Sequence, residues 1–275
     1  MKKIRAVIAV LVLFSGILYL AHRLEGSSVS DNPPPFFYVP PFQYVNTASG
    51  SFRVVCADIF YIRAILSVSE SGKGYLEYIL DNLRLAVSLD SRLTSAYLIG
   101  GIVAPRGKAE IPPAIRFLKE SMERRPGEWK IPFWIAFNYY QLGDYGKAAE
   151  FYEKAFRLPE APRYLKGLIS FSYYQSGQAE MGVNFLEGLR ASVKDRELLK
   201  QIDRKLKWLK NIVFLEEKVS EFERVYARLP KDLEELVSSG VIQVIPEDSF
   251  GQGYYIVPYW NGQRNEGRVR SKLPQ

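Results

Sequence analysis

The stretch AFNYYQLGDYGKAAEFYEKAF, residues 136–156, predicts a pair of packed helices joined by a tight turn. Ala136 and Ala148 are small enough to let two helices approach closely, and Gly143 can adopt the positive φ that ends a helix. Tyr139 supplies an aromatic side chain that fills the space between this helical hairpin and the next. We therefore expect a structural unit over this stretch rather than an isolated active site.

The same pattern of residues recurs at a distance of 34 positions along the chain. The matched pairs are Gly143 with Gly177, Tyr139 with Tyr173, Ala136 with Ser170 and, in the other direction, Ala148 with Ala114. Around them, from about Ser51 to Leu229, apolar residues recur at the spacing of one face of an α-helix. A fixed period over helical hairpins indicates repeated units that bury their apolar faces by stacking on one another.

These residues resemble the tetratricopeptide repeat (TPR), a helix-turn-helix unit that stacks into a superhelix. The resemblance is clearest over residues 129–162, whereas the copy at 163–196 has Gly182 where alanine is usual. In the preceding copy, GIVAPRG at residues 101–107 falls where the first helix should run, so we expect that helix to be short or displaced. The resemblance implies a mostly α fold in which residues 51–196 form a TPR-like α-solenoid of stacked helical hairpins. A generic α-solenoid with divergent repeats is the alternative.

A long helix is predicted over residues 197–229, and we expect it to cap the repeats, since repeat arrays need a terminal unit with a polar outer face. The apolar residues of this region fall along one broad stripe: Leu198, Leu199, Ile202, Leu206, Leu209, Val213, Val219 and Phe222. Beside the stripe lies a basic cluster made of Arg204, Lys205, Lys207 and Lys210. We interpret the cluster as a solvated helix face, with contact to anionic lipid or to an acidic partner as the alternative.

The last segment, residues 230–275, predicts a small α+β tail made of a short helix and a β-hairpin. DLEELVSSG reads as a helix closed by Gly240, and VIQVI at 241–245 alternates like a strand. The stretches YYIVPYW and GRVRS flank an Asn-Gly pair, which favours a tight turn between two paired strands.

This tail resembles the C-terminal end of the major pseudopilins of type II secretion. The matching residues are Pro230, Leu233, Leu236, Gly240, Ile245, Pro246, Asp248, Phe250, Gly251 and Tyr255, with Ser249 in place of a second proline. Pseudopilins carry a calcium site after this turn, but here NGQRNEGRVR offers one acid among three arginines, so we expect no metal and no cofactor. We expect Asp248 to cap backbone amides and Phe250 to fill a core.

The N-terminal 21 residues carry the features of a signal anchor. The basic stretch KKIR precedes a charge-free apolar run from Ala6 to Ala21, which approaches the roughly 20 residues that span a bilayer if the flanking arginine snorkels. We predict a single-pass anchor over residues 1–21, in contact with the inner (cytoplasmic) membrane through residues 4–21. The positive-inside rule then places the bulk of the chain outside the cytoplasm. A cleaved signal peptide is the competing interpretation.

Residues 22–50 form a predicted Pro-rich linker. Prolines disfavour helix and favour extended backbone, so we interpret this segment as a stiff spacer, with a ligand for a Pro-binding module as the alternative.

The composition of the chain excludes several classes of binding partner and catalytic site. The net charge of +7 would suit nucleic acid, but the predicted location across a membrane argues against such a partner. The only histidine is His22, which excludes catalytic sites built on imidazole, and the only cysteine is Cys56, which excludes an intramolecular disulfide. A carboxylate-based hydrolase would need two acids facing one cleft, and acids such as Asp144, Glu150 and Glu153 sit at the spacing of exposed helix faces. We therefore predict that the chain is not an enzyme.

The sequence favours a membrane-anchored scaffold whose concave repeat face binds an envelope protein or peptide, in the assembly of an envelope or secretion/pilus system. In TPR proteins the groove is lined mainly by the first helix of each repeat, so the resemblance implies six candidate residues: Trp134, Phe137, Asn138, Gln141, Phe171 and Tyr174. The alternative is a structural component of a pilus or secretion apparatus that makes its contact through the C-terminal tail.

Overall fold

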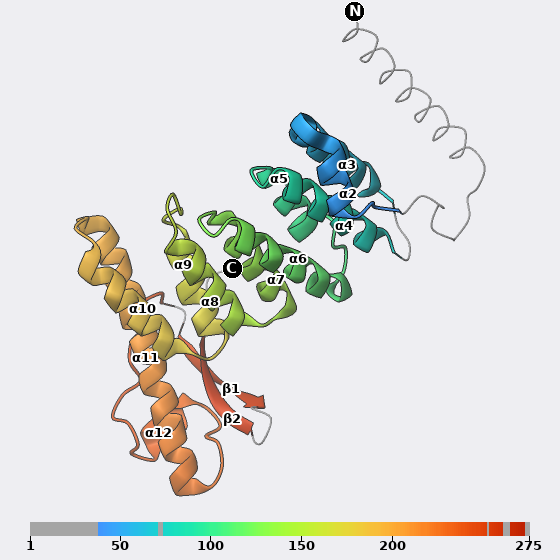
Figure 1. The fold of residues 1–275 in the computed structure, drawn as a ribbon. Coiled ribbons are helices and arrows are strands. Elements are labelled where there is room, and N and C mark those ends of the chain that lie inside the picture. The colour runs from blue at the N-terminus through green and yellow to red at the C-terminus, as the bar shows by residue number, and fades with distance from the viewer. Residues whose placement is uncertain (1–37, 71–73, 252, 261–264, 273–275) are drawn as a thin grey trace, which may run out of the picture. The chain divides into compact units, whose positions relative to one another are not determined.

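A computed structural model describes residues 38–70, 74–251, 253–260 and 265–272 (Figure 1). The chain is mostly helical, with a small antiparallel sheet of two strands near its C-terminus, which confirms the predicted fold class at that level. It divides into two compact units, residues 1–89 and residues 90–275. The predicted anchor lies outside the described residues, and among those that are described no helix is both long and apolar enough to cross a bilayer.

The first unit contains α2 (Phe42–Ser49), η1 (Gly50–Phe52), α3 (Arg53–Ser67) and α4 (Tyr75–Leu89), with α3 and α4 packed side by side. Helix α2 lies inside the segment predicted as a linker. Pro41 immediately precedes it, and residues 42–49 contain no proline, so nothing interrupts the helical backbone there. The linker prediction therefore extends too far, because it took the proline-rich composition of the earlier residues to continue to residue 50.

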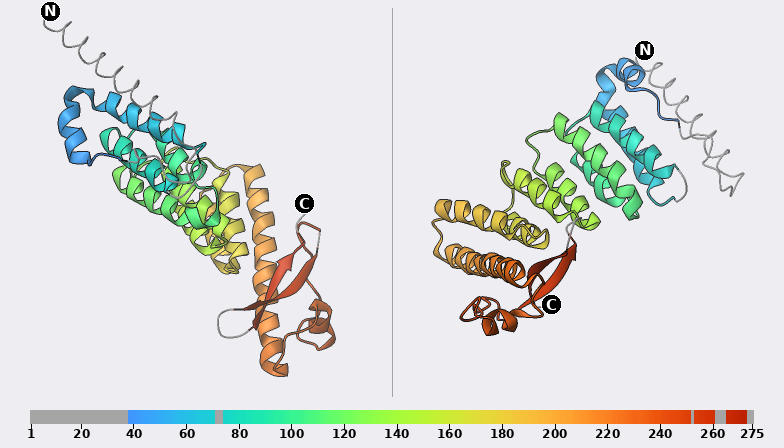
Figure 2. Two further views of the ribbon diagram at one scale, coloured as in Figure 1. Left: turned by 90° about the vertical axis from the view of Figure 1, so that its right-hand side faces the viewer. Right: turned by 90° about the horizontal axis from the view of Figure 1, so that it is seen from below.

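The second unit begins with α5 (Thr94–Leu98), the π-helical turn η2 (Ile99–Val103) and η3 (Lys108–Glu110). Five helices follow: α6 (Ile111–Arg124), α7 (Lys130–Leu142), α8 (Tyr145–Phe156), α9 (Leu165–Gln175) and α10 (Ala179–Ser192). Each of these packs on the next in the chain, and α10 packs on α11 (Figure 2). The order of packing thus follows the order of the sequence.

The turn between α7 and α8 has the predicted geometry. Gly143 has φ of 81°, and its amide donates to the carbonyl of Tyr140, which ends α7. Asp144 then caps α8 by accepting from the amide of Lys147. Ala136 and Ala148 are fully buried, as expected for small residues at a close helix contact. The helical hairpin over the opening stretch is therefore confirmed.

Two glycines mark close contacts between helices. A Cβ added at Gly101 in η2 would lie 2.7 Å from the Cδ1 atom of Leu118, a buried side chain that would have to move to admit it. Gly101 lies where the predicted short helix is interrupted. A Cβ added at Gly182 in α10 would lie 3.0 Å from the Cδ1 atom of Leu209. The departure from alanine at this position has a physical reason, since a leucine of α11 occupies the space.

Helix α11 is continuous from Arg196 to Tyr226, close to the residues predicted for the long helix. The tail follows as α12 (Leu233–Ser238), β1 (Tyr254–Trp260) and β2 (Asn265–Ser271). The two strands pair antiparallel, with Tyr254 opposite Ser271, as predicted.

The prediction of a strand at residues 241–245 is wrong, because the backbone there is irregular. Alternation alone does not make a strand when no second strand lies alongside to complete the hydrogen bonds. Instead, the amide of Ile242 donates to the carbonyl of Leu236, and its side chain joins the core shared by α10, α11 and the tail.

Candidate interaction surface

One face of α7 and one face of α9 carry similar side chains 34 residues apart. On α7 the face contains Trp134, Phe137 and Gln141, and the residues 34 positions later on α9 are Leu168, Phe171 and Gln175. Gln141 is exposed and the other five are partly exposed. We call these six residues the α7–α9 face. Four of the six predicted groove residues, Trp134, Phe137, Gln141 and Phe171, belong to it, and Phe171 also packs against the core shared by α10, α11 and the tail.

Aromatic contacts link the N-terminal ends of the two helices beside this face. The ring of Phe133 in α7 lies 6.5 Å from the ring of Tyr164, the residue that precedes α9, in an edge-to-face arrangement. The same ring lies 5.7 Å from that of Tyr152 in α8, whose burial raises its pKa to about 12. Helix α8 therefore supports both α7 and the start of α9 through one shared phenylalanine.

Asn138 does not belong to the exposed face, contrary to the prediction. Its side chain is 1% exposed, and its Nδ2 atom donates to the carbonyl of Gly101 at 2.8 Å and to that of Trp134 at 3.0 Å. The first of these bonds crosses from α7 to η2, so Asn138 connects two helical segments. The TPR pattern did not reveal this role, because the bond is a tertiary contact with a carbonyl 37 residues earlier in the chain.

Tyr174 is likewise buried, at 3% exposure, and the reason is the C-terminal hairpin. Its hydroxyl accepts a hydrogen bond from the amide of Ser271 at 2.9 Å, and the guanidinium carbon of Arg270 lies 4.9 Å from its ring centre. On its other side the ring lies 4.6 Å from that of Trp208. Burial raises the pKa of Tyr174, although the amide of Ser271 opposes the shift. The residue is a docking point for the hairpin rather than a free groove residue.

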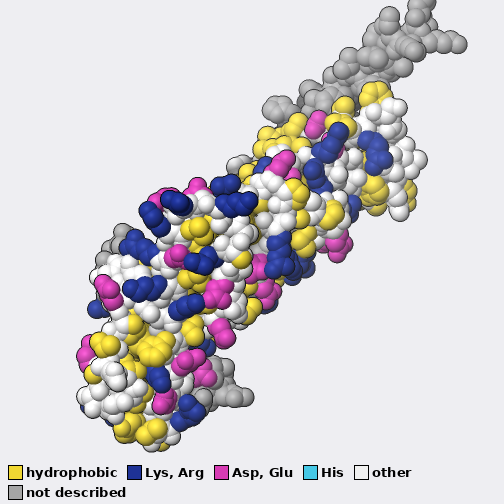
Figure 3. All heavy atoms as spheres, turned by 90° about the vertical axis from the view of Figure 1, so that its left-hand side faces the viewer, with side chains coloured by type: hydrophobic (Ala, Val, Ile, Leu, Met, Phe, Trp, Pro, Cys, Tyr) yellow, Lys and Arg dark blue, Asp and Glu magenta, His cyan; other side chains and the backbone are white. Residues whose placement is uncertain are grey.

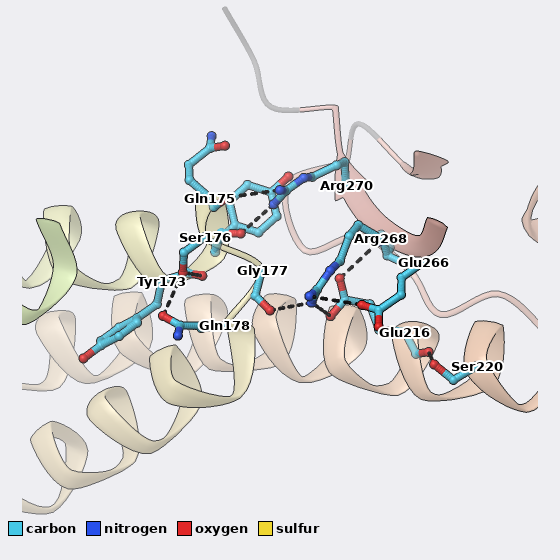
Figure 4. Close-up of polar contacts among 12 residues, drawn as sticks. Tyr173, Gln175, Ser176, Gly177, Gln178, Glu216, Ser220, Glu266, Arg268 and Arg270 are labelled. Carbon is cyan, nitrogen blue, oxygen red and sulfur yellow. Dashed lines mark hydrogen bonds and ion pairs between the residues drawn. The ribbon is translucent and has the colours of Figure 1, made fainter. Parts of the chain in front are cut away.

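Two arginines of β2 fix the hairpin to the end of α9 (Figure 4). Arg270 donates to the carbonyls of Tyr174 at 2.5 Å and Gln175 at 3.0 Å, and Arg268 donates to that of Gly177 at 2.7 Å. The last carbonyls of a helix have no partner within the helix and carry partial negative charge, which a guanidinium satisfies well. The hairpin therefore lies against the C-terminal end of α9, next to Gln175 of the α7–α9 face.

A carboxylate of α11 completes this junction. Glu216 accepts from the amide of Val269 at 3.2 Å, and its Oε2 atom lies 3.9 Å from Nη1 of Arg268. Burial raises the pKa of Glu216, and the charge of Arg268 works in the opposite direction. Figure 4 shows Arg268 pointing between Glu216 and the carbonyl of Gly177, so one guanidinium joins the hairpin to both α11 and the α9–α10 turn.

The turn that precedes the hairpin is closed by Asp248, as predicted. Its Oδ1 atom accepts from the amide of Phe250 at 2.9 Å, and its Oδ2 atom accepts from the hydroxyl of Ser271 at 2.8 Å. The ring of Phe250 lies edge-on to Trp208 at 5.6 Å, within the core. Both carboxylate oxygens of Asp248 thus serve the fold, and within the described ranges no group of three or more His, Cys, Asp or Glu residues could hold a metal ion.

Two members of the basic cluster of α11 contact neighbouring parts of the chain. Arg204 donates to the carbonyl of Ser249 at 2.9 Å, while Lys210 pairs with Glu187 at 2.6 Å. Figure 3 shows Lys and Arg interspersed with Asp and Glu over the face that it displays. On that face the structure therefore gives no continuous field of one sign to favour an anionic surface.

Two of the three acids considered for hydrolytic chemistry, Asp144 and Glu153, are also engaged locally. Asp144 pairs with Lys147 at 2.6 Å besides capping α8. Glu153 accepts from the hydroxyl of Tyr173 at 3.0 Å and pairs with Arg157 at 2.8 Å. Each carboxylate has a role in joining or ending helices.

Comparison of the chain with protein-family models and with curated proteins gave no match. Sequence reasoning missed two members of the α7–α9 face, Leu168 and Gln175, although the 34-residue period that gave Phe171 from Phe137 would have found both.

Proposed function

We propose that the chain is a membrane-anchored scaffold of TPR-like repeats, stacked as an α-solenoid, which binds a peptide or helix of another envelope protein on the extracytoplasmic side. The α7–α9 face is the proposed binding surface. The observation that carries the proposal is the recurrence of similar apolar and amide side chains, exposed or partly exposed, on two helices at a spacing of 34 residues. Stacked repeats commonly use such a face to bind extended partners.

The chemistry of the face fits a largely uncharged ligand. Trp134, Phe137 and Phe171 offer partly exposed aromatic surface, which favours apolar anchors on a partner. Gln141 and Gln175 can each donate to and accept from a peptide backbone. We therefore propose a segment with apolar side chains at regular spacing as the ligand, bound in a secretion, pilus or other envelope assembly.

Paired substitutions test this proposal. The full chain carrying Phe137→Ala with Phe171→Ala would be purified from membranes beside the wild type, and the co-purifying envelope proteins would be quantified. Met181→Ala is a matched control, because Met181 is 50% exposed on α10, away from the proposed face. We expect the double variant to lose a partner that the control retains. An unchanged set of partners for the double variant would contradict the proposal.

The tail provides the second candidate, a structural role in a secretion or pilus apparatus. Tyr255 and Tyr259 lie on the same face of β1 and are 40% and 45% exposed. Tyr254 and Ile256 lie on the opposite face and pack against the core. A strand that presents two tyrosines to solvent is suited to contact with another protein. Tyr255→Ala with Tyr259→Ala separates the candidates: loss of the partner here, with retention in the double phenylalanine variant, would assign the contact to the tail.

A further inference from the structure

The first unit exposes an apolar stripe along one side of α3. The stripe begins with Phe52, the last residue of η1, at 70% exposure, and continues along α3 with Val55 at 54%, Ile59 at 38%, Ile62 at 53% and Leu66 at 69%. The opposite side of the helix is already buried, through Ala57, Phe60 and Ala64. The described fold of this unit therefore leaves the α3 stripe without a covering element, and isolated surface hydrophobics do not account for five in a row.

The spacing of the α3 stripe is that of a coiled-coil seam. Its members follow one another at intervals of three, four, three and four residues, which places them at the a and d positions of two consecutive heptads and at the first a position of a third. In this register Asp58 takes a g position and Arg63 an e position. In a parallel pair of helices, a g residue meets the e residue five positions further along on the partner helix, and the spacing from Asp58 to Arg63 is the one required.

The position of the Asp58 carboxylate beside the α3 stripe favours a protein partner over a lipid surface. Asp58 is exposed and lies on the flank of the stripe, beside Val55 and Ile62 on the helix surface. Burial of this carboxylate in hydrocarbon would be unfavourable without a cation. A second copy of α3 supplies one, since Arg63 is a planar donor with several N–H groups. Within its own chain the Nη2 atom of Arg63 donates to Tyr78 Oη at 2.9 Å and to the carbonyl of Tyr38 at 3.2 Å.

We propose that the α3 stripe is a homodimer interface, in which α3 helices of two copies pack in parallel with Asp58 of each copy facing Arg63 of the other. A small apolar hollow of about 390 Å³ between α2 and α3, with Ile59 in its lining, adjoins the seam and gives it additional apolar surface. Parallel pairing directs both N-termini to the same side, which is compatible with two predicted anchors in one membrane. This inference concerns the first unit and is independent of the α7–α9 face.

Cysteine crosslinking in native membranes tests the proposal on the full chain. With Cys56→Ser the chain has no other cysteine, so Leu66→Cys introduces a single thiol in the seam. Parallel pairing brings the two introduced thiols together, and we expect a covalent dimer on oxidation. Val244→Cys in the same background is the matched control, because Val244 is 72% exposed and lies in the tail. An equal yield from both positions would mean random collision and would overturn the proposal.

A second substitution tests whether the seam drives the pairing. Ile62→Arg, added to the Leu66→Cys chain, should reduce the crosslink yield at least about tenfold, because it places two cations in the apolar seam. Val244→Arg should leave the yield unchanged. Ile62 is 53% exposed, so the helicity of the variant should match that of the wild type by circular dichroism. An undiminished yield with Ile62→Arg would overturn the proposal. A mixture of Phe52→Cys chains with Leu66→Cys chains tests the direction of packing. If the covalent dimer formed only between one chain of each kind, the helices would pack antiparallel, and the proposal of a parallel pair would be overturned.

Discussion

Asn138 and Gln141 lie three residues apart on α7, and the structure predicts opposite consequences of replacing them with alanine. Asn138→Ala removes the 2.8 Å hydrogen bond to the carbonyl of Gly101 and leaves that acceptor without its side-chain donor. An unsatisfied buried acceptor costs about 1–3 kcal/mol, and the lost carboxamide also leaves a small void, so we expect a loss of about 2–3 kcal/mol of unfolding free energy. Gln141 is exposed, and Gln141→Ala should change stability by less than about 0.5 kcal/mol.

Urea denaturation of the full chain, followed by circular dichroism at constant detergent, measures both effects. For a unit of this size the expected loss with Asn138→Ala corresponds to a fall in melting temperature of roughly 5–10 °C. Partner binding, normalised to folded protein, should be retained in Asn138→Ala and weakened in Gln141→Ala. The reverse pattern, a stable Asn138→Ala chain that no longer binds, would refute the assignment of Asn138 to the interior.

Three further substitutions test separate features of the fold. Gly143→Ala should destabilise the chain by about 1–2 kcal/mol in urea denaturation, because φ of 81° is unfavourable for a residue with Cβ. Arg270→Ala should increase amide hydrogen exchange in the last turn of α9, since the carbonyl of Gln175 loses its donor; unchanged protection there would contradict the docking role. Glu235, hydrogen-bonded to Arg228 at 2.6 Å, has its pKa lowered to about 2 chiefly by that contact. Its stabilising effect is therefore complete above about pH 4.5 and is lost as the pH falls toward 2. The urea midpoint of Glu235→Gln should accordingly lie below that of the wild type at pH 7 and converge with it in acid.

Local features of the fold were predictable because they depend on neighbouring residues. Gly143 ends a helix for reasons contained in its own backbone freedom, and the Asn-Gly pair between the strands favours a hairpin without reference to the rest of the chain. The stripe of α11 is visible as a periodicity. Asp248 could be assigned to a turn because short acidic side chains bond backbone amides close to them in sequence, as it does with Phe250.

Features that depend on distant residues were not predictable in the same way. The residue of α7 that lies 34 positions before Tyr174, Tyr140, is exposed, but Tyr174 itself is covered by β2, almost a hundred residues later in the chain. Asn138 is buried and donates to a carbonyl of η2. The irregular turn of η2 does not follow the 34-residue period, so the period could not predict this contact. Residues 241–245 alternate like a strand, yet whether a strand forms depends on a partner that lies elsewhere. In each case the deciding contact is tertiary.

Site-specific photocrosslinking tests the central claim, that the α7–α9 face binds another protein, most directly. A photoreactive phenylalanine analogue would replace Gln141 or Gln175 in the full chain expressed in cells, with Met181 on α10 as the control position. We predict that both positions on the face crosslink to the same envelope protein and that position 181 does not. An absence of crosslinks from both positions, or equal crosslinks from all three, would contradict the claim.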